Sequence, residues 1–351
     1  MNFTFYSKTD YLTQLAQDID HAKPGERVLV ATMDFNSGEP LIAEVLESLL
    51  RAAERGVKAS LLVDARSFLT VDNSLKPGPL WWHPTLGQPF EGRYKTTMDW
   101  VARLNEAGCR TVVTNVPDRA FRFPSASRSH IKAGIIADKL YLGGCNLNHQ
   151  EYFDVMVAQH NKEAADWVYE QLQLVLDAKS TQQAFQYKDR SATIGNDTSV
   201  LIDSGKPKQS IILDAAHTLI DEAQEWLYIT CQYFPGGATA KRLVAAERRG
   251  VKVTIRFSHP SVHGQEFPLH VLHQLYERTR VPAHFFAGRL AKGMPKLHAK
   301  VLCSEKEAIV GSHNFVSQGV TWGTAEIALH VKNQDFARGL REFMEAQINR
   351  Q

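Results

Sequence analysis

The sequence has almost no excess charge, few cysteines and no long hydrophobic run. Its 40 lysines and arginines against 38 aspartates and glutamates leave a formal net charge of +2, which does not indicate a partner that is a polyanion. The four cysteines (Cys109, Cys145, Cys231 and Cys303) are scattered, which disfavours a zinc site or a disulfide framework. No run approaches the roughly 18 apolar residues of a membrane-spanning helix, and the first residues lack the pattern of a secretory signal. We therefore expect a cytoplasmic protein that can contact a membrane only at its surface.

The sequence does contain an internal repeat. The stretch AAERGVKASLLVDA begins at Ala52, and AAERRGVKVTIRFS begins at Ala245. Each is typical of a helix end, a glycine turn and a buried strand. In each copy a strand, a helix and a second strand precede this stretch, and an amphipathic helix closes the copy. We therefore predict one repeat over residues 1–180, a polar linker over 181–199 and a second repeat over 200–351.

A second duplicated pattern places a histidine and a lysine two residues apart. The first copy is SHIKAGIIADKLYLGGCNLN, with His130 and Lys132, and the second is KLHAKVLCSEKEAIVGSHNF, with His298 and Lys300. Alternate residues of a strand point to the same face, so the imidazole and the ammonium group of each copy should project together. The strand that follows a short charged turn should pair with this one as a hairpin.

The hairpin's second strand carries an asparagine at a matching offset in each copy. Asn146 follows Gly144 in the first copy, and Asn314 follows Ser312 in the second. An acidic residue then opens an apolar strand in each copy, Asp154 in the first and Glu326 in the second. We expect these two carboxylates to accept the outer ring N–H of the histidines, which would set the tautomer and raise the basicity of the ring.

The order of the elements predicts an α/β fold of two similar domains with mixed, largely parallel sheets. Related by a pseudo-twofold axis within one chain, the copies would form an intramolecular pseudo-dimer and bring the two half-sites face to face. The resulting pocket would suit a tetrahedral phosphate, since lysines and asparagines can bind its oxygens as charge develops. One histidine could attack phosphorus and the other could protonate the leaving alcohol. Because lysines supply the charge, this chemistry predicts no metal and no cofactor.

The paired His-x-Lys and Gly-[Gly/Ser]-x-Asn pattern resembles the phospholipase D superfamily, whose members carry two HKD motifs. The stretch QYFP at Gln232–Pro235 and the AAERGVK element resemble the bacterial cardiolipin synthase branch. The resemblance implies two tandem phospholipase D-like domains and a phosphohistidine intermediate. It also implies that His130 is the nucleophile and His298 the acid and base, although the symmetry of the sequence alone leaves these roles open. The aspartate that the family has five positions after the lysine is replaced here by Ala137 and Glu305.

Several further residues are candidates for substrate binding. The first repeat has an insertion at about residues 70–97, rich in glycine, proline and aromatic residues, in which Trp81 and Trp82 could form a lid, a membrane wedge or a base-stacking platform. Self-packing of the loop is an equal alternative. Arg128, just before the first histidine, could hold a second phosphate or be solvated. His270 and His273 have helical spacing that could bind a metal, but no third ligand is apparent, and we favour a solvated or half-buried helix face.

These observations predict a phosphodiesterase or phosphatidyltransferase acting on a phospholipid and on water or an alcohol acceptor. We expect a monomer, since two pseudo-symmetric halves complete the site within one chain. A metal-independent nuclease of the same superfamily is the alternative, since the same steps cleave nucleic acids. A catalytically silent phosphate- or lipid-binding protein is the second alternative.

Overall fold

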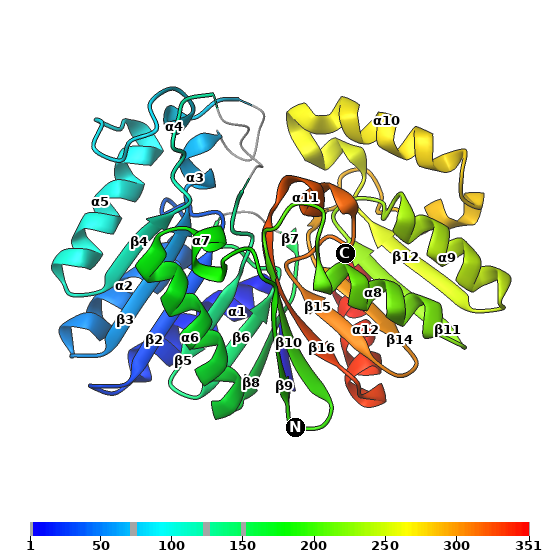
Figure 1. The fold of residues 1–351 in the computed structure, drawn as a ribbon, viewed down its shortest axis with the longest axis horizontal. Coiled ribbons are helices and arrows are strands. Elements are labelled where there is room, and N and C mark those ends of the chain that lie inside the picture. The colour runs from blue at the N-terminus through cyan, green and yellow to red at the C-terminus, as the bar shows by residue number, and fades with distance from the viewer. Residues whose placement is uncertain (1–2, 71–75, 122–126, 149–151, 351) are drawn as a thin grey trace.

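The computed structural model describes residues 3–70, 76–121, 127–148 and 152–350 of the chain (Figure 1). The first repeat forms a seven-stranded sheet in the order β1-β8-β6-β5-β2-β3-β4. Its strands are β1 (Phe3–Tyr6), β2 (Arg27–Thr32), β3 (Lys58–Asp64), β4 (Arg110–Thr114), β5 (Ala133–Ile136), β6 (Lys139–Gly143) and β8 (Met156–His160). Its helices are α1 (Lys8–His21), α2 (Pro40–Glu54), α3 (Arg66–Leu69), α4 (Pro79–Trp82), α5 (Gly92–Glu106) and α6 (Lys162–Ala178).

The second repeat forms another seven-stranded sheet, in the order β12-β11-β14-β15-β16-β10-β9. Its strands are β9 (Arg190–Ile194), β10 (Thr198–Ser204), β11 (Trp226–Cys231), β12 (Lys252–Phe257), β14 (Lys300–Ser304), β15 (Ala308–Gly311) and β16 (Ala325–Val331). Its helices are α8 (Ile211–Glu222), α9 (Ala238–Arg248), α10 (Phe267–Arg278), α11 (Ser317–Trp322) and α12 (Gln334–Asn349), with 3₁₀ turns η1 (Pro260–Glu266) and η2 (Ala283–Phe286). Matching strands occupy matching places in the two sheets, which explains the repeat in the sequence.

Both sheets are mixed, as the sequence predicts, but their parallel part is smaller than expected. Parallel pairing joins β2, β3 and β4 in one sheet and β11 and β12 in the other. The hairpins β5–β6 and β14–β15 run antiparallel, and so do the strands that flank them. Within these two sheets, the strands that run parallel are those linked by helical crossovers, whereas a short turn forces its two strands to be antiparallel.

The segment 181–199 is not the linker that its polar composition predicts. It contains α7 (Thr181–Phe185) and strand β9, which pairs antiparallel with β10 at the edge of the second sheet. Phe185 is fully buried and Ile194 is 1% exposed, so both belong to the core. The few apolar residues of this stretch anchor it to the core. The polar composition of the stretch as a whole does not reveal them.

The two repeats pack into one body. Strands β7 (Tyr152–Phe153) and β13 (Lys296–Leu297), one from each repeat, form a small parallel sheet between them. One hydrophobic cluster includes Leu142 and Leu172 of the first repeat together with Val310 and Leu340 of the second. A further cluster lies within each half, under the outer helices. The shared cluster fixes how the two histidine motifs face one another.

Candidate active site

The two motif histidines are held by the opposite repeat through their backbones. His130 precedes β5 and donates its backbone N–H to the carbonyl of Ala325, at 2.7 Å. His298 precedes β14 and donates in the same way to the carbonyl of Phe153, at 2.8 Å. Each acceptor is the residue immediately before a predicted carboxylate. The backbone therefore sets each histidine beside the acidic residue of the other copy.

The histidine–carboxylate pairs are accordingly crossed between the repeats. The Nδ1 atom of His130 lies 2.8 Å from Oε2 of Glu326, and Nδ1 of His298 lies 2.7 Å from Oδ2 of Asp154. The sequence predicts both carboxylates as partners but does not say which histidine each one serves. With Nδ1–H donated to a carboxylate, Nε2 is left with its lone pair, as a nucleophile or base requires.

Lys132 and Lys300 lie directly behind the histidines. Lys132 Nζ donates to the backbone carbonyl of His130 at 2.7 Å, and Lys300 Nζ donates to that of His298. Both side chains are fully buried. Burial and the charge of Lys300 lower the pKa of Lys132 to about 7, and burial lowers the pKa of Lys300 to about 8. An anion bound beside them would raise both values.

Burial also acts on the histidines and carboxylates. It lowers the pKa of His130 and of His298 well below the usual value, and the charge of the nearby lysine adds to this effect. Burial raises the pKa of Asp154, and it raises the pKa of Glu326 to about 8. Burial thus disfavours charge on either member of each pair. Before a substrate binds, the positive charge of the site is therefore carried by its lysines and arginines rather than by its histidines.

Two asparagines complete the duplicated pattern and line the same cavity as the histidines. The Oδ1 atom of Asn146 accepts from the backbone N–H of Asp34 at 3.3 Å, which leaves its amide nitrogen for a ligand. The Oδ1 atom of Asn314 is buried and has no hydrogen-bond partner among the residues that the structure describes. A buried amide with an unsatisfied atom is costly, so the second asparagine indicates a place where a ligand or water would bind.

Gly144 and Ser312 occupy equivalent positions but have different surroundings, so a serine does not fit in place of Gly144. The Ser312 hydroxyl donates to Oε2 of Glu326, the same oxygen that accepts from His130. At Gly144, an added Cβ would lie 2.1 Å from Oδ1 of Asp154. The serine therefore supports the longer carboxylate, whereas the glycine makes room for the shorter one.

The cavity that contains both histidines has a volume of about 450 Å³. The sequence reasoning missed several residues of its wall, among them Arg66, Tyr152, Tyr233 and Lys296. The Tyr152 ring stacks on the ring of His298, with centroids 5.3 Å apart. Lys296 lies two residues before His298 and Tyr152 two before Asp154, so strand alternation could have identified both. Arg66 follows a buried strand, with no motif to mark it.

Of the predicted substrate-binding residues outside the motifs, Arg128 lines the cavity, whereas Trp81 and Trp82 do not. Arg128 lines the cavity and is 3% exposed, with Nη1 at 3.5 Å from Oδ1 of Asp64, so it is not a solvated surface residue. Trp81 and Trp82 lie on α4 and are not among the residues that line the cavity. Trp82 is 52% exposed and packs edge-on against Phe121. The insertion forms α4 and the start of α5, whereas its residues 71–75 lie outside the described chain. Trp322 of α11 lines the cavity instead.

One group at the rim of the cavity could hold a metal ion. His263, Glu266 and His270 offer ligand atoms that lie within 4.8 Å of one another. His273 does not belong to this group, and its Nε2 atom contacts the carbonyl of Phe234 instead. The other two ligands come from the 3₁₀ turn η1: Glu266 lies four residues before His270, a helical spacing that the sequence analysis overlooked, whereas His263 lies seven residues before it. Glu266 also faces Arg66 and Lys296, whose positive charges disfavour a cation there.

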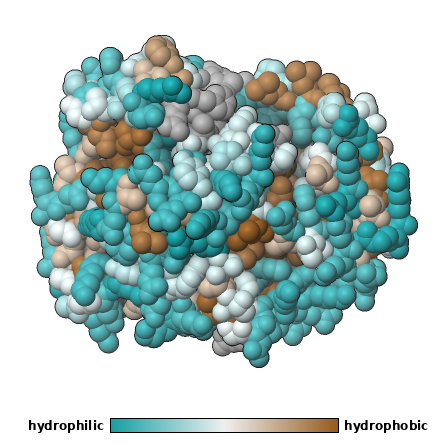
Figure 2. Space-filling view, in the orientation of Figure 1, coloured by the Kyte–Doolittle hydropathy of each residue, from teal (hydrophilic) through white to brown (hydrophobic). Residues whose placement is uncertain are grey.

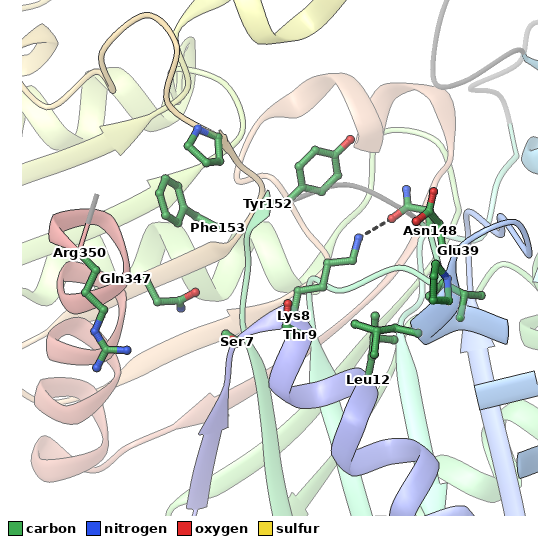
Figure 3. A pocket seen from close by; sticks show the side chains of 14 residues that line it. Ser7, Lys8, Thr9, Leu12, Glu39, Asn148, Tyr152, Phe153, Gln347 and Arg350 are labelled. Atoms are coloured by element: carbon green, nitrogen blue, oxygen red, sulfur yellow. Dashed lines mark hydrogen bonds between the residues drawn. The ribbon is translucent and has the colours of Figure 1, made fainter. Parts of the chain in front are cut away.

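A larger cavity of about 620 Å³ lies on the other side of Tyr152, which lines both (Figure 3). In Figure 3, Lys8 at the start of α1 points toward Asn148, to which its Nζ donates at 2.7 Å. The catalytic candidates do not line this cavity. The smaller cavity is therefore the candidate active site.

The two altered motif positions lie in hairpin turns at the strand ends away from the histidines. Ala137 has a φ of 52° in the β5–β6 turn. Glu305, in the β14–β15 turn, accepts backbone N–H groups at the start of β11, including that of Gln224 at 3.0 Å. Both residues belong to the framework, and neither lines the cavity.

Residues 217–348 match the protein family described as "Cardiolipin synthase, PLD-like domain". The chain is 24% identical to cardiolipin synthase A of Proteus mirabilis (strain HI4320) over 94% of its own length. It spans 65% of the length of that relative. The resemblance predicted from the two motifs is therefore confirmed.

Solved structures show the same fold over nearly the whole chain. A phosphatidylserine synthase of Haemophilus influenzae Rd KW20 matches with a TM-score of 0.70 at 14% identity, over 99% of this chain and 86% of that one. A polyphosphate kinase from Porphyromonas gingivalis matches with a TM-score of 0.61 at 14% identity, over 99% of this chain and 47% of that one. At such identities the likeness concerns the fold alone. In the described ranges, every helix is too short or too polar to cross a membrane.

Proposed function

We propose that this phospholipase D-like protein cleaves or exchanges a phosphodiester bond of a phospholipid through a phosphohistidine, as a phosphodiesterase or phosphatidyltransferase. The observation that carries the proposal is the crossed pairing of two buried histidines, each bonded through Nδ1 to a carboxylate of the other repeat, on one cavity. The similar protein named as a cardiolipin synthase supports a phospholipid as the substrate.

In the first step, Nε2 of His130 attacks phosphorus as the P–O bond to the leaving alcohol breaks. The bonding electrons move to the leaving oxygen, which takes a proton from Nε2 of His298. His298 must therefore enter this step as the imidazolium, protonated on both ring nitrogens, and the negative charge of the bound phosphodiester favours that form. Glu326 holds the other ring nitrogen of His130 and stabilises the positive charge that develops on the ring. We assign the role of nucleophile to His130 because the family resemblance implies that the histidine of the first motif attacks phosphorus. The two histidines have equivalent contacts to a carboxylate.

In the second step, neutral His298 removes a proton from water or from an acceptor alcohol. The activated oxygen attacks phosphorus, the N–P bond breaks, and His130 regains its lone pair. Water as the acceptor gives hydrolysis, and an alcohol gives transfer of the phosphatidyl group. Asp154 keeps His298 oriented through both proton transfers.

Charge stabilisation comes from two layers of residues. Asn146, Asn314, Arg66 and Arg128 line the cavity and can donate to the phosphate oxygens. Lys132 and Lys300, 0% exposed and bonded to backbone carbonyls, act from behind the histidines. In a site that excludes water, such fixed donors stabilise the charge of the transition state more than they would in water.

The test is a side-by-side assay of phosphatidylglycerol vesicles, with and without an added alcohol, and of single-stranded DNA, all in excess chelator. We expect lipid turnover that His130→Ala abolishes and that does not require an added divalent ion. DNA cleavage without lipid turnover would show a nuclease instead. No turnover of either substrate, with phosphate still bound, would show a silent binding protein.

A further inference from the structure

Helix α10 (Phe267–Arg278) presents its apolar face outward. Gln274 and Glu277 are its buried residues, at 5% and 4% exposure. Leu269, Leu272 and Leu275 are 57%, 63% and 52% exposed. Their spacing of three residues places the leucines along one side of the helix. A helix at the surface of a soluble protein normally buries such a stripe, so its exposure indicates a partner surface.

Polar contacts on the inner side hold the helix in this orientation. Glu277 Oε1 accepts the backbone N–H of Gly237 at 3.2 Å. Arg289 donates to Oε1 of Gln274 at 3.2 Å, and His273 Nε2 lies 3.1 Å from the carbonyl of Phe234. Rotating α10 to bury its leucines would break all three of these hydrogen bonds and leave their polar groups without partners. The outward leucines are therefore a fixed feature of the fold.

The chemistry of the outer face matches an anionic lipid surface. From Phe267 to Arg280 the charged side chains in the exposed class are Arg278 and Arg280, both positive. Tyr276 is 51% exposed and lies beneath the Arg280 guanidinium, 3.9 Å from the ring centroid. A leucine stripe edged by an aromatic ring and arginines is typical of helices that lie in the interface of a membrane.

This face is continuous with the mouth of the candidate active site. Leu269 is exposed on the outer face and also lines the cavity that holds the two histidines. Trp322 of α11 is 43% exposed and lines the same cavity. In Figure 1, α10 and α11 lie at the same end of the molecule, and Figure 2 shows hydrophobic residues gathered over α10 at the upper right.

We propose that α10 docks the protein on a phospholipid bilayer, with its leucines in the interface and its arginines against anionic headgroups. The choice of a bilayer rests on the proposed function, because a phospholipid substrate must enter through the mouth beside Leu269. Contact along α10 would place that mouth at the level of the headgroups. The docking surface consists of Phe267, Leu269, Leu272, Leu275, Tyr276, Arg278 and Arg280.

The test compares the double variant Leu272→Glu/Leu275→Glu with the parent protein. Neither leucine lines the cavity, and both side chains are exposed, so folding should be preserved and is checked by thermal unfolding. Leu174→Glu on α6, at 40% exposure, is the matched control. Binding is measured by co-sedimentation with phosphatidylglycerol–phosphatidylcholine vesicles. Turnover is measured on the same vesicles and on a short-chain phospholipid kept monomeric.

We expect the double variant to bind vesicles roughly tenfold more weakly or worse, since it removes two apolar contacts and adds charge of the wrong sign. Vesicle turnover should fall with binding, whereas turnover of the monomeric lipid should stay unchanged. Leu174→Glu should bind vesicles and turn over lipid as the parent does.

Equal vesicle binding by parent and double variant would overturn the docking surface and leave the proposed function standing. Vesicle binding through α10 without turnover of any lipid would retain the surface and overturn the function. A parent dimer that the double variant dissociates in sedimentation velocity, without vesicle binding by either, would assign α10 to a second copy and overturn the proposal.

Discussion

The two halves of the candidate site come from one duplicated sequence pattern, yet they differ in their supporting residues. In the half-site of His130, Glu326 lines the cavity and accepts from both the histidine and Ser312. In the half-site of His298, Asp154 is fully buried, and among the described residues no serine hydroxyl donates to its carboxylate. The opposite repeat supplies the carboxylate in both cases. The difference shows that a repeated motif can give two histidines distinct environments, which distinct roles in catalysis require.

The histidines themselves should show the largest effect. We expect His130→Ala and His298→Ala each to lower kcat by about a thousandfold or more, because each removes a group that acts in the chemical step. The double variant should be little worse than either single variant. His160→Ala, an exposed histidine outside the cavity, serves as the control. Substantial activity in either single variant would rule out a shared site, and trapping with a slow substrate should label His130.

The carboxylates come next and test the crossed pairing. Glu326→Gln and Asp154→Asn should each lower kcat by about a hundredfold or more, because an amide can hold the wrong tautomer of its histidine. Glu326→Gln should perturb the ring resonances of His130, and Asp154→Asn those of His298, when both are followed by NMR. Perturbation of the histidine in the same repeat would contradict the crossed arrangement.

Exchanging the small residues should separate the half-sites further. Gly144→Ser would place Cβ against Asp154, so we expect it to lower activity about tenfold or more and to lower the free energy of unfolding by about 1–3 kcal/mol. Ser312→Gly removes a hydroxyl but creates no clash, so its effect should be smaller. Turnover and denaturant unfolding measure both. Equal effects of the two changes would show that the half-sites are interchangeable.

Proton uptake should be the smallest effect and concerns the lysines. The pKa of Lys132 is about 7 and that of Lys300 about 8, and a bound anion favours the protonated form. Binding of sulfate, which does not titrate in this range, should therefore take up protons near pH 7–8, and its affinity should fall as pH rises through this range. Calorimetry in two buffers of different ionisation enthalpy measures the uptake. Lys132→Met should reduce it, whereas proton release on binding would contradict the assigned sign.

Much of the candidate site could be predicted because its chemistry lies in short, repeated strand motifs. His130, Lys132 and Asn146 could be identified from spacing alone, and their second copies gave the prediction its specificity. Residues from the short helical turns that follow a strand could not be found this way, as His263 in η1 and Arg66 in α3 show. Trp81 and Trp82 were chosen because they lie in an insertion rich in aromatic residues, and they are not among the residues that line the cavity. Residues 181–199 are mostly polar, so their composition likewise did not predict that Phe185 anchors this segment in the core.

The repeat, the mixed α/β class and the residue types of the candidate site follow from the amino-acid sequence, because alternation along strands and equal offsets are local properties. The bond of each histidine to the carboxylate of the other repeat does not follow from it, since this bond depends on the shared core and on backbone bonds between the copies. The outward face of α10 was likewise decided in three dimensions. Its leucine spacing predicts an apolar face, but only the polar contacts of Gln274 and Glu277 with the body of the protein turn that face to the outside.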